Sequence, residues 1–324
     1  MKAAYLTETG SPEVIQFGDL PEPSCDAGQV LIETKAVCVN PIDTYVRSGK
    51  VAFELPIPFV LGCDAAGVVA AVGEGVDSFK VGDRVWCTNQ GLLGRQGTFA
   101  ERIAVDAPWC FPLPASVDFE TAAANALVGV TAHLGLFRSA CLEPGETILV
   151  IGGTGGVGSM VLQMAKAAGA TVITTGGNAE KCERATDLGA DHAIDYSSQA
   201  IGDAVKRLAP AGVNVLWETR REPDFELAVD VLAQRGRMVL MAGRDARPEF
   251  PVGPFYVNEL SLHGFVMFKA TALEMKRCAK DIRKWMKKGK LRACIAHRLP
   301  LFAAAEAHRL QEAGDVGGKI VLTV

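Results

Sequence analysis

The clearest pattern of apolar positions lies in the middle of the chain. Four consecutive apolar residues, 148–151, run directly into a glycine-rich segment, 152–158. Apolar residues then recur at helical spacing through 160–168, and an extended, β-branched run follows at 171–175. These spacings predict a strand, a tight loop, a helix and a second strand, which together form a strand-helix-strand unit of about 30 residues.

The glycines of this loop suggest a binding site. Gly153, Gly155 and Gly158 fit the pattern Gly-x-Gly-x-x-Gly between a predicted strand and a predicted helix. Such glycines allow a tight turn and let a pyrophosphate approach bare backbone, while the helix N-terminus offers unpaired N–H groups. A glycine-rich turn that binds nothing is the alternative. The strand before the loop and the helix after it favour a dinucleotide site.

After this unit, strands and helices continue to alternate. We predict strands at 193–196, 213–218, 237–242 and 262–268, and helices at 179–188, 201–208 and 225–233. Such alternation predicts an α/β fold with a doubly wound parallel sheet, covered on both faces and binding ligands at the carboxyl ends of its strands.

The first hundred residues show a different pattern, of short strands and turns. Strand-like runs cover 30–39, 67–72 and 82–86, and frequent prolines and glycines interrupt any long helix. This pattern predicts a compact, irregular β-barrel domain.

The predicted domain boundaries follow from where these patterns change. Alanine and leucine predominate over 119–140, which predicts helices, and 319–324 predicts a strand that returns to the first domain. We therefore expect one domain made of 1–120 and 265–324, and a second domain made of 121–264.

Composition and charge narrow the function. Lys and Arg number 33 and Asp and Glu number 37, so no basic field favours nucleic acid or an anionic membrane surface. No run reaches the roughly 20 apolar residues that span a bilayer, and residues 1–8 show no leader-like segment. The nine cysteines are scattered without any Cys-x-x-Cys. We expect a cytoplasmic protein with reduced thiols and a small-molecule substrate.

Several short motifs, read together, resemble one family. They are the stretch Asn-Pro-Ile-Asp-Thr-Tyr-Val-Arg-Ser-Gly at 40–49, the segment 61–67, Gly-Asp-Arg-Val at 82–85, the glycine loop at 154–158 and Gly-Gly-Lys-Ile-Val at 317–321. The whole chain is similar to the medium-chain dehydrogenase/reductase superfamily and, within it, to the zinc-free quinone oxidoreductases that include zeta-crystallin. The stretch 40–49 is the specific signal, because the glycine loop and Gly-Asp-Arg-Val are shared across the superfamily.

This resemblance implies an architecture. It implies a GroES-like catalytic domain built from both ends of the chain, a Rossmann domain inserted between them, and an active site in the cleft that separates the two. It also implies a homodimer with 262–268 as the pairing edge.

The resemblance bears on metal binding as well. Zinc-dependent relatives hold zinc with Cys and His side chains, but here Asn40 stands where the first cysteine would be and Cys63 where a histidine would be. The stretch that would carry a structural zinc offers only Cys87, and one thiol cannot build a four-ligand site. We expect no metal. An unusual site made of Cys38, Cys63 and Asp64 is the alternative.

Asn40, Tyr45 and Arg47 are the predicted catalytic residues. The amide of Asn40 and the phenol of Tyr45 can hydrogen-bond a nicotinamide, its ribose or a substrate oxygen, although Tyr45 could also be a packed surface aromatic. For Arg47 and Asp43, a local ion pair that shapes the loop is an equal alternative. The predicted cofactor contacts are Asn40, Tyr45, Thr154, Gly155, Gly156, Val157, Gly177, Lys181, Tyr196 and Lys319.

The end of the strand at 171–175 indicates which dinucleotide binds. An NAD enzyme usually presents an Asp or Glu there to the ribose hydroxyls, whereas 174–178 reads Thr-Thr-Gly-Gly-Asn. Lys181, one turn into the next helix, adds positive charge that suits a 2′-phosphate, so NADPH is favoured over NADH. The resemblance places adenosine contacts on Gly177, Lys181 and Tyr196. An ordinary surface lysine is the alternative for Lys181.

The chain departs from the resembled family after the strand at 213–218. Arg220 and Arg221 follow where a small, glycine-containing turn is usual. They could add phosphate contacts or close a surface turn.

These inferences combine into one predicted activity. Without a metal to stabilise charge on a simple ketone, a conjugated acceptor is favoured, because hydride adds to one end and the charge delocalises onto oxygen. We therefore predict an NADPH-dependent, zinc-free reductase of quinones or related α,β-unsaturated carbonyls. The alternatives are an enoyl-thioester or alkenal reductase, and an NADPH-binding protein with little turnover, such as a lens crystallin or redox sensor.

Overall fold

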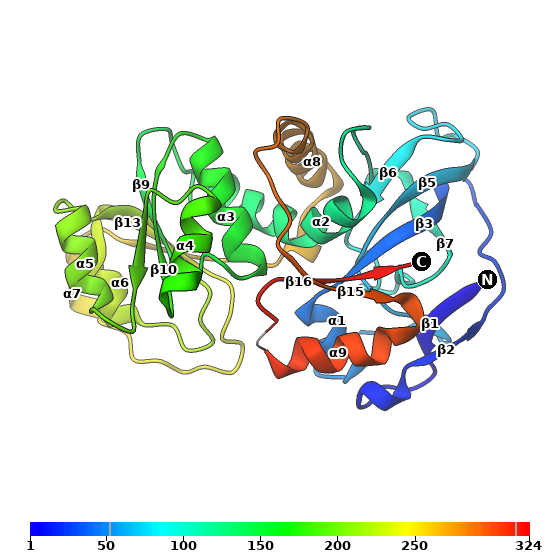
Figure 1. Cartoon of the computed structure of the whole chain (residues 1–324), viewed down its shortest axis with the longest axis horizontal. Helices are drawn as coiled ribbons and strands as arrows, with labels where there is room; N and C mark the ends of the chain where they lie inside the picture. Colours follow the sequence, from blue (N-terminus) through cyan, green and yellow to red (C-terminus); the bar gives the residue numbers. More distant parts are fainter. Residues whose placement is uncertain (52, 315) are drawn as a thin grey trace. The chain divides into compact units, whose positions relative to one another are not determined.

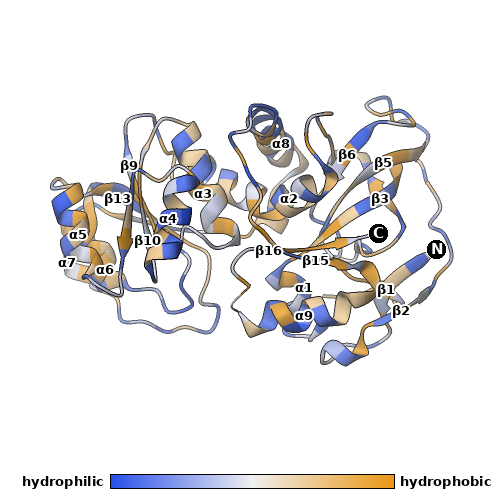
Figure 2. Cartoon of the chain, in the orientation of Figure 1, coloured by the Kyte–Doolittle hydropathy of each residue, from blue (hydrophilic) through white to orange (hydrophobic). Residues whose placement is uncertain are grey.

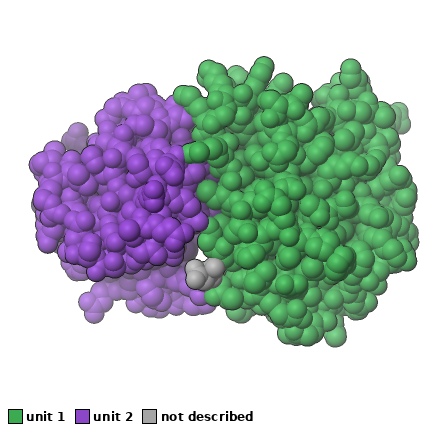
Figure 3. Space-filling view, in the orientation of Figure 1, with its two compact units in different colours: residues 1–130, 268–324 green, residues 131–267 purple. Residues whose placement is uncertain are grey.

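The chain folds as two compact units. The computed structural model describes residues 1–51, 53–314 and 316–324. Unit 1 consists of 1–130 and 268–324, and unit 2 of 131–267 (Figure 3). The predicted boundaries lay after residues 120 and 264.

Unit 1 is built mainly from β-strands. Its strands are β1 Lys2–Leu6, β2 Gln16–Asp19, β3 Gln29–Val39, β4 Phe59–Val60, β5 Asp64–Val72, β6 Arg84–Cys87, β7 Arg102–Asp106, β8 Cys110–Pro112, β15 Ile295–Pro300 and β16 Lys319–Thr323. Its helices are α1 Pro41–Arg47, α2 Phe119–His133, which continues into unit 2, α8 Ala272–Lys287 and α9 Ala304–Ala313, with single 3₁₀ turns at Pro12–Val14, Ala107–Trp109, Met267–Lys269 and Leu301–Ala303.

The main sheet of unit 1 joins the two ends of the chain. Its strand order is β15-β16-β3-β5-β6-β8, with β7 also pairing β3, and a smaller sheet runs β2-β1-β4. β16 pairs antiparallel with β3, with Val321 opposite Cys38. The predicted return of 319–324 to the first domain is therefore confirmed, and it explains why the blue and red ends of the chain lie in one body in Figure 1.

Apolar side chains on these strands form the core of unit 1. The buried cluster includes Val37, Val39, Phe99, Ile320 and Leu322, all at most 1% exposed. α8 buries Met275, Cys278 and Ile282 and exposes its cationic side chains, so this helix is drawn mostly in the hydrophilic colour in Figure 2. This division into apolar and polar faces is typical of a helix that covers a domain surface.

Unit 2 is a parallel sheet with helices on both faces. Its strands are β9 Thr147–Val150, β10 Thr171–Gly176, β11 His192–Asp195, β12 Val213–Glu218, β13 Leu232–Leu240 and β14 Ser261–Gly264. Its helices are α3 Gly156–Ala167, α4 Ala179–Asp187, α5 Ile201–Leu208, α6 Phe225–Val231 and α7 Val252–Val257, with a π-helical turn at Leu134–Ser139. The strand order is β11-β10-β9-β12-β13-β14, and every pair is parallel.

This topology confirms the predicted doubly wound α/β fold. α3 and α4 lie on one side of the sheet in Figure 1, and α5 and α6 lie on the other. The chain starts at β9, proceeds outward to β11, and then crosses to β12 on the other side of β9. The switch point therefore lies between β9 and β12, where doubly wound sheets bind ligands.

The elements β15, α1 and α7 are among those that were not predicted, and the helix predicted at 225–233 and the strand predicted at 262–268 were too long. β15 alternates half-buried and exposed residues and ends in Pro300, so it lacks the apolar run of an inner strand. α1 begins with Pro41 after the N-cap Asn40, a start signal that the sequence analysis did not use. The strand predicted at 262–268 ends at Gly264, and a 3₁₀ turn follows at Met267–Lys269.

No helix among the described residues is both long and apolar enough to cross a membrane.

Candidate active site

The glycine loop of unit 2 has the backbone that a dinucleotide phosphate requires. Gly152 has a φ of +77°, and Gly155 is the N-cap residue of α3. A Cβ at Gly158 would lie 2.2 Å from the Gly152 carbonyl oxygen, so the loop packs directly against the first turn of α3. A Cβ at Gly155 would have its nearest neighbour at 3.5 Å, which leaves this backbone open to an approaching group. The same loop contains the predicted contacts Thr154, Gly156 and Val157.

The carboxyl end of β10 carries no acidic side chain. Asn178 caps α4, and its Oδ1 accepts a hydrogen bond from the backbone N–H of Lys181 at 2.8 Å. A Cβ at Gly177 would lie 2.6 Å from the Tyr196 hydroxyl oxygen, so this phenol covers Gly177. The structure thus gathers three predicted adenosine contacts, Gly177, Lys181 and Tyr196, around the start of α4.

In unit 1, Asn40 lies at the centre of a buried polar network. It stands between β3 and α1 and is fully buried. Its Nδ2 donates to Asp64 Oδ2 at 2.9 Å and to the Cys38 carbonyl at 3.3 Å, and its Oδ1 accepts from Lys319 Nζ at 2.6 Å. Its backbone N–H donates to Asp43 Oδ2 at 2.7 Å. These contacts occupy both ends of the amide.

Lys319 binds this network rather than an exposed surface. Its side chain is buried, and Nζ also donates to the Val39 carbonyl at 2.9 Å. Asp64 accepts further hydrogen bonds from Thr88 Oγ1 at 2.6 Å and from the Leu127 N–H at 3.2 Å. The predicted cofactor contact of Lys319 stays a prediction, since the contacts seen are with unit 1 itself.

Burial shifts the titration of both carboxyl groups in this network. Burial raises the pKa of Asp43 to about 7, although hydrogen bonds from the Cys63 thiol and the Asn40 N–H act in the opposite direction. Burial also raises the pKa of Asp64 to about 6, although the charge of Lys319 and the hydrogen bonds from Thr88 and Asn40 favour the ionised form. Both groups therefore titrate near neutral pH.

The raised pKa of Asp43 predicts how stability depends on pH. The folded pKa of about 7 exceeds the usual value of 3.8, so between these values the folded state binds more protons than the unfolded state. The stabilisation is complete below the unfolded pKa and is lost as pH rises through 7. The Asp43→Asn variant should therefore show a shallower fall in unfolding free energy between pH 5 and 7.5 than the parent, measured by urea titration. Equal slopes for the two proteins would contradict this assignment.

The thiols near Asn40 remain protonated at neutral pH. Burial raises the pKa of Cys38 to about 12, and burial together with the charges of Asp43 and Asp64 raises that of Cys63 well above its usual range. Across the part of the chain that the structure describes, no three His, Cys, Asp or Glu side chains are grouped so as to hold a metal ion.

Tyr45 and Arg47, the two predicted catalytic residues on α1, differ in their exposure to solvent. Tyr45 is 37% exposed, whereas Arg47 is 2% exposed and forms an ion pair with Glu312 of α9. Arg47 Nε and Nη1 have no hydrogen-bond partner among the described residues. Burial and the charge of Arg47 lower the pKa of nearby His308 to about 3, so this imidazole stays neutral. Arg47 thus lies inside unit 1 and pairs with a distant helix, whereas Asp43 accepts from the Asn40 N–H. The predicted catalytic role of Arg47 stays a prediction.

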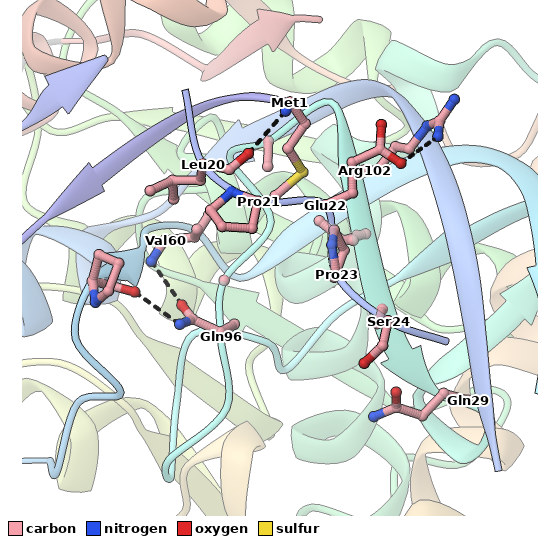
Figure 4. Close-up of a pocket in the computed structure, with 15 residues that line it drawn as sticks. Met1, Leu20, Pro21, Glu22, Pro23, Ser24, Gln29, Val60, Gln96 and Arg102 are labelled. Atoms are coloured by element: carbon pink, nitrogen blue, oxygen red, sulfur yellow. Dashed lines mark hydrogen bonds and ion pairs between the residues drawn. The ribbon is translucent and has the colours of Figure 1, made fainter. Parts of the chain in front are cut away.

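A hollow of about 430 Å³ elsewhere in unit 1 contains none of the predicted site residues. Its polar groups bind one another: Gln96 accepts from the Val60 N–H at 2.8 Å, Arg102 pairs with Glu22 at 2.7 Å, and the Met1 amino group donates to the Leu20 carbonyl at 2.9 Å (Figure 4). Because this hollow contains none of the predicted site residues, we place the candidate site elsewhere.

Sequence reasoning missed part of the Asn40 network. It considered Asp64 only as an alternative metal ligand and did not consider Thr88. The available signal was an acidic residue within the apolar run that becomes β5, because a carboxylate can be buried there only with hydrogen-bonding or charged partners.

Comparison with known proteins agrees with this geometry. Residues 26–115 match the family described as alcohol dehydrogenase GroES-like domain, and residues 156–284 match the family described as zinc-binding dehydrogenase. A quinone oxidoreductase of Lama guanicoe is 32% identical over 99% of this chain and 97% of its own length.

Solved structures extend the comparison to the whole fold. The Escherichia coli quinone oxidoreductase complexed with NADPH superposes with a TM-score of 0.86 at 29% identity, covering 100% of both chains. A structure described as an NAD-dependent alcohol dehydrogenase superposes with a TM-score of 0.91 at 33% identity, also covering 100% of both chains. The chain therefore belongs to the medium-chain dehydrogenase/reductase superfamily, as a quinone oxidoreductase-like, NAD(P)-dependent reductase.

Proposed function

We propose that this enzyme uses NADPH to reduce a quinone or a related α,β-unsaturated carbonyl, and that it does so without a metal. The observation that carries the cofactor choice is the end of β10, where Gly176, Gly177 and Asn178 stand and no carboxylate would repel a 2′-phosphate. The name of the Lama guanicoe relative and the NADPH in the Escherichia coli structure support the same choice.

Each part of the cofactor site has a role that its chemistry fits. The backbone of 154–157 and the N-terminus of α3 would hold the pyrophosphate. Gly177, Lys181 and Tyr196 would hold the adenosine end. Bound NADPH supplies the hydride, and the polar groups of this chain must orient the acceptor and stabilise charge on its oxygen.

The Asn40 network supports a reaction without zinc. The resemblance places Asn40 where zinc-dependent relatives have their first cysteine ligand, and its amide oxygen lies 2.6 Å from the ammonium of Lys319. A buried ammonium among these oxygens balances the carboxylates that a metal ion would otherwise have to neutralise. A conjugated acceptor suits such a site, because its charge spreads over several atoms and needs less stabilisation than that of a simple ketone. A stoichiometric metal in the purified protein would contradict this part of the proposal.

Tyr45 is the best candidate for contact with the acceptor or the nicotinamide. Within the motif 40–49, the amide of Asn40 is occupied and Arg47 is buried, whereas Tyr45 is 37% exposed. Asn40 then acts as a positioning residue, since it caps the helix that carries Tyr45.

Replacing Tyr45 by phenylalanine tests this role. Loss of one hydroxyl that hydrogen-bonds in the transition state should lower kcat by about tenfold, with little effect on thermal stability. Steady-state kinetics against the acceptor that the parent uses best would measure this. Unchanged kcat and unchanged NADPH affinity would remove Tyr45 from the site.

Replacing Lys181 by alanine tests the cofactor choice. The variant should bind NADPH about tenfold more weakly and bind NADH as the parent does, because only NADPH offers a phosphate to the ammonium. Fluorescence titration with each reduced nucleotide gives both dissociation constants. The exposed Lys290→Ala variant, on unit 1, is the control for a nonspecific loss of positive charge. A parent enzyme that prefers NADH would overturn the cofactor choice itself.

A substrate panel tests the reaction. Quinones, enones and enoyl thioesters are each offered with NADPH, and oxidation is followed by loss of absorbance at the reduced nicotinamide band. Fastest turnover with quinones or enones is expected. Preference for enoyl thioesters would favour the related thioester or alkenal reductase, and tight NADPH binding without any turnover would favour a nucleotide-binding protein.

We also infer a cytoplasmic homodimer that pairs along β14. This strand is the outer strand of the sheet in unit 2. Leu262 within it is 40% exposed, and Val266, just beyond its end, is 42% exposed. The outer edge of such a strand is suited to pairing with a second copy. Light scattering that finds only a monomer at micromolar concentration would contradict the dimer.

A further inference from the structure

The turn after β12 holds an arginine in a fixed orientation. Arg220 Nε donates to Glu218 Oε1 at 3.0 Å and Nη2 donates to Oε2 at 2.7 Å, while its backbone N–H also donates to Oε1 at 2.9 Å. Glu218 is fully buried, and Asp224 lies 3.9 Å from Arg220 Nη1. Such a forked pair fixes the plane of the guanidinium. The exposed fraction of the Arg220 side chain is 34%, so part of that plane remains accessible.

This turn borders the glycine loop. Thr219 Oγ1 donates to the Ile151 carbonyl at 2.7 Å, and it would lie 2.6 Å from a Cβ at Gly152. β12 and β9 are paired neighbours at the switch point of the sheet. Arg220 therefore follows the strand that forms one wall of the dinucleotide site.

Tyr196 comes from the other side of the same site. It follows β11, and its hydroxyl covers Gly177 at the end of β10. Burial alone would lower the pKa of Arg220, but the hydrogen bonds that it donates to Glu218 raise it, with smaller electrostatic contributions from Glu218, Asp224 and Tyr196. Tyr196 follows β11 and Arg220 follows β12, so the two residues come from strands on opposite sides of β9 in the sheet.

We propose that the guanidinium of Arg220, held in plane by Glu218, packs flat against the adenine ring of the bound cofactor. The negative charges of Glu218 and Asp224 balance its positive charge, so it is poorly suited to attract a phosphate. Its planar face suits an aromatic ring, because guanidinium groups stack on such rings. On this proposal Arg220 neither contacts a phosphate nor merely closes a surface turn. It forms part of the adenine subsite.

The inference rests on the dinucleotide site of unit 2 and not on the choice between NADPH and NADH. Adenine is common to both cofactors, so loss of Arg220 should weaken the binding of NADPH and of NADH by the same factor. Loss of Lys181, by contrast, should weaken only NADPH. The two variants therefore fail in distinguishable ways.

The test uses the full-length enzyme and ADP-ribose, which carries adenine and pyrophosphate but neither nicotinamide nor a 2′-phosphate. Isothermal titration should show binding to Arg220→Ala that is about fivefold to thirtyfold weaker than to the parent. Arg220→Lys, which keeps the charge but not the planar group, should bind ADP-ribose more weakly by a similar factor. Arg221→Ala, an exposed neighbour of the same charge, should change affinity less than twofold.

Three results would overturn the proposal. Parent-like binding of ADP-ribose to Arg220→Lys would show that no planar group is needed. A larger loss for NADPH than for NADH would show that Arg220 acts on the 2′-phosphate. If Arg220→Ala weakened the binding of inorganic pyrophosphate, which has no base, as much as that of ADP-ribose, the effect would be a general one of charge. If Arg220→Ala unfolds because Glu218 loses its partner, thermal melting reveals it and Arg220→Lys decides the question.

Discussion

Replacement of Lys319 by methionine should destabilise unit 1 by about 3–5 kcal/mol, because it leaves buried carboxylates without their cation. Lys319 Nζ lies 2.6 Å from Asn40 Oδ1, and its charge favours ionised Asp64. In a unit of this size such a loss lowers Tm by roughly 10 °C. Differential scanning calorimetry measures the shift, and the exposed Lys290→Met variant should melt as the parent does.

The size of this loss should depend on pH. Without Lys319 the pKa of Asp64 rises further, so at pH 5 the variant avoids a buried charge by protonating Asp64 at little cost, whereas at pH 8 the same protonation costs more free energy. The Tm difference from the parent should therefore be larger at pH 8. In addition, Lys319→Met combined with Asp64→Asn should lose less stability than Lys319→Met alone. A loss that is the same at both pH values, with no recovery in the double variant, would show that Lys319 contributes only packing.

Replacement of Gly158 by alanine should lower kcat/KM with NADPH by about a hundredfold, since displacing a binding loop by about 1 Å has effects of this size. The new Cβ would lie 2.2 Å from the Gly152 carbonyl oxygen and 3.1 Å from the Gly153 Cα, both backbone atoms, so the loop itself must move. Fluorescence titration should show weaker binding of NADPH and NADH alike.

Gly253→Ala is the matched control for this variant. Gly253 lies in α7 of the same unit, and a Cβ there would have no neighbour within 4 Å. It should leave binding unchanged. Parent-like binding by Gly158→Ala would mean that the close contact between loop and helix is not needed to hold the cofactor.

Most of the fold of unit 2 could be predicted from sequence, for a local reason. Most strands and helices there carry their own periodic pattern, and the helix at 201–208 and the strand at 213–218 match α5 and β12 residue for residue, whereas α7 was not predicted. The glycine pattern also acts locally, since its turn and its helix start lie within a few residues. Short-range patterns of this kind are visible in a single sequence.

The site in unit 1 was less accessible to such reasoning. Asn40 follows β3, Asp64 begins β5 and Lys319 begins β16, and the Lys319 contact spans 279 residues of sequence. No local pattern specifies that pairing. Arg47 illustrates the same difficulty, because its partner Glu312 is 265 residues away on α9. Motif matching identified Tyr45 and Arg47 as candidates, whereas their division into an exposed and a buried residue required the structure.

The placement of β16 beside β3 also has a consequence for the order in which the protein folds during synthesis. Unit 2 lies within one continuous segment, 131–267, whereas unit 1 needs strands from both sides of it. Because domains fold as their residues leave the ribosome, unit 2 is expected to fold first. Until β16 emerges, Asn40 and Asp64 lack the ammonium of Lys319. The polar network at the start of α1 is therefore completed among the last events of biosynthesis.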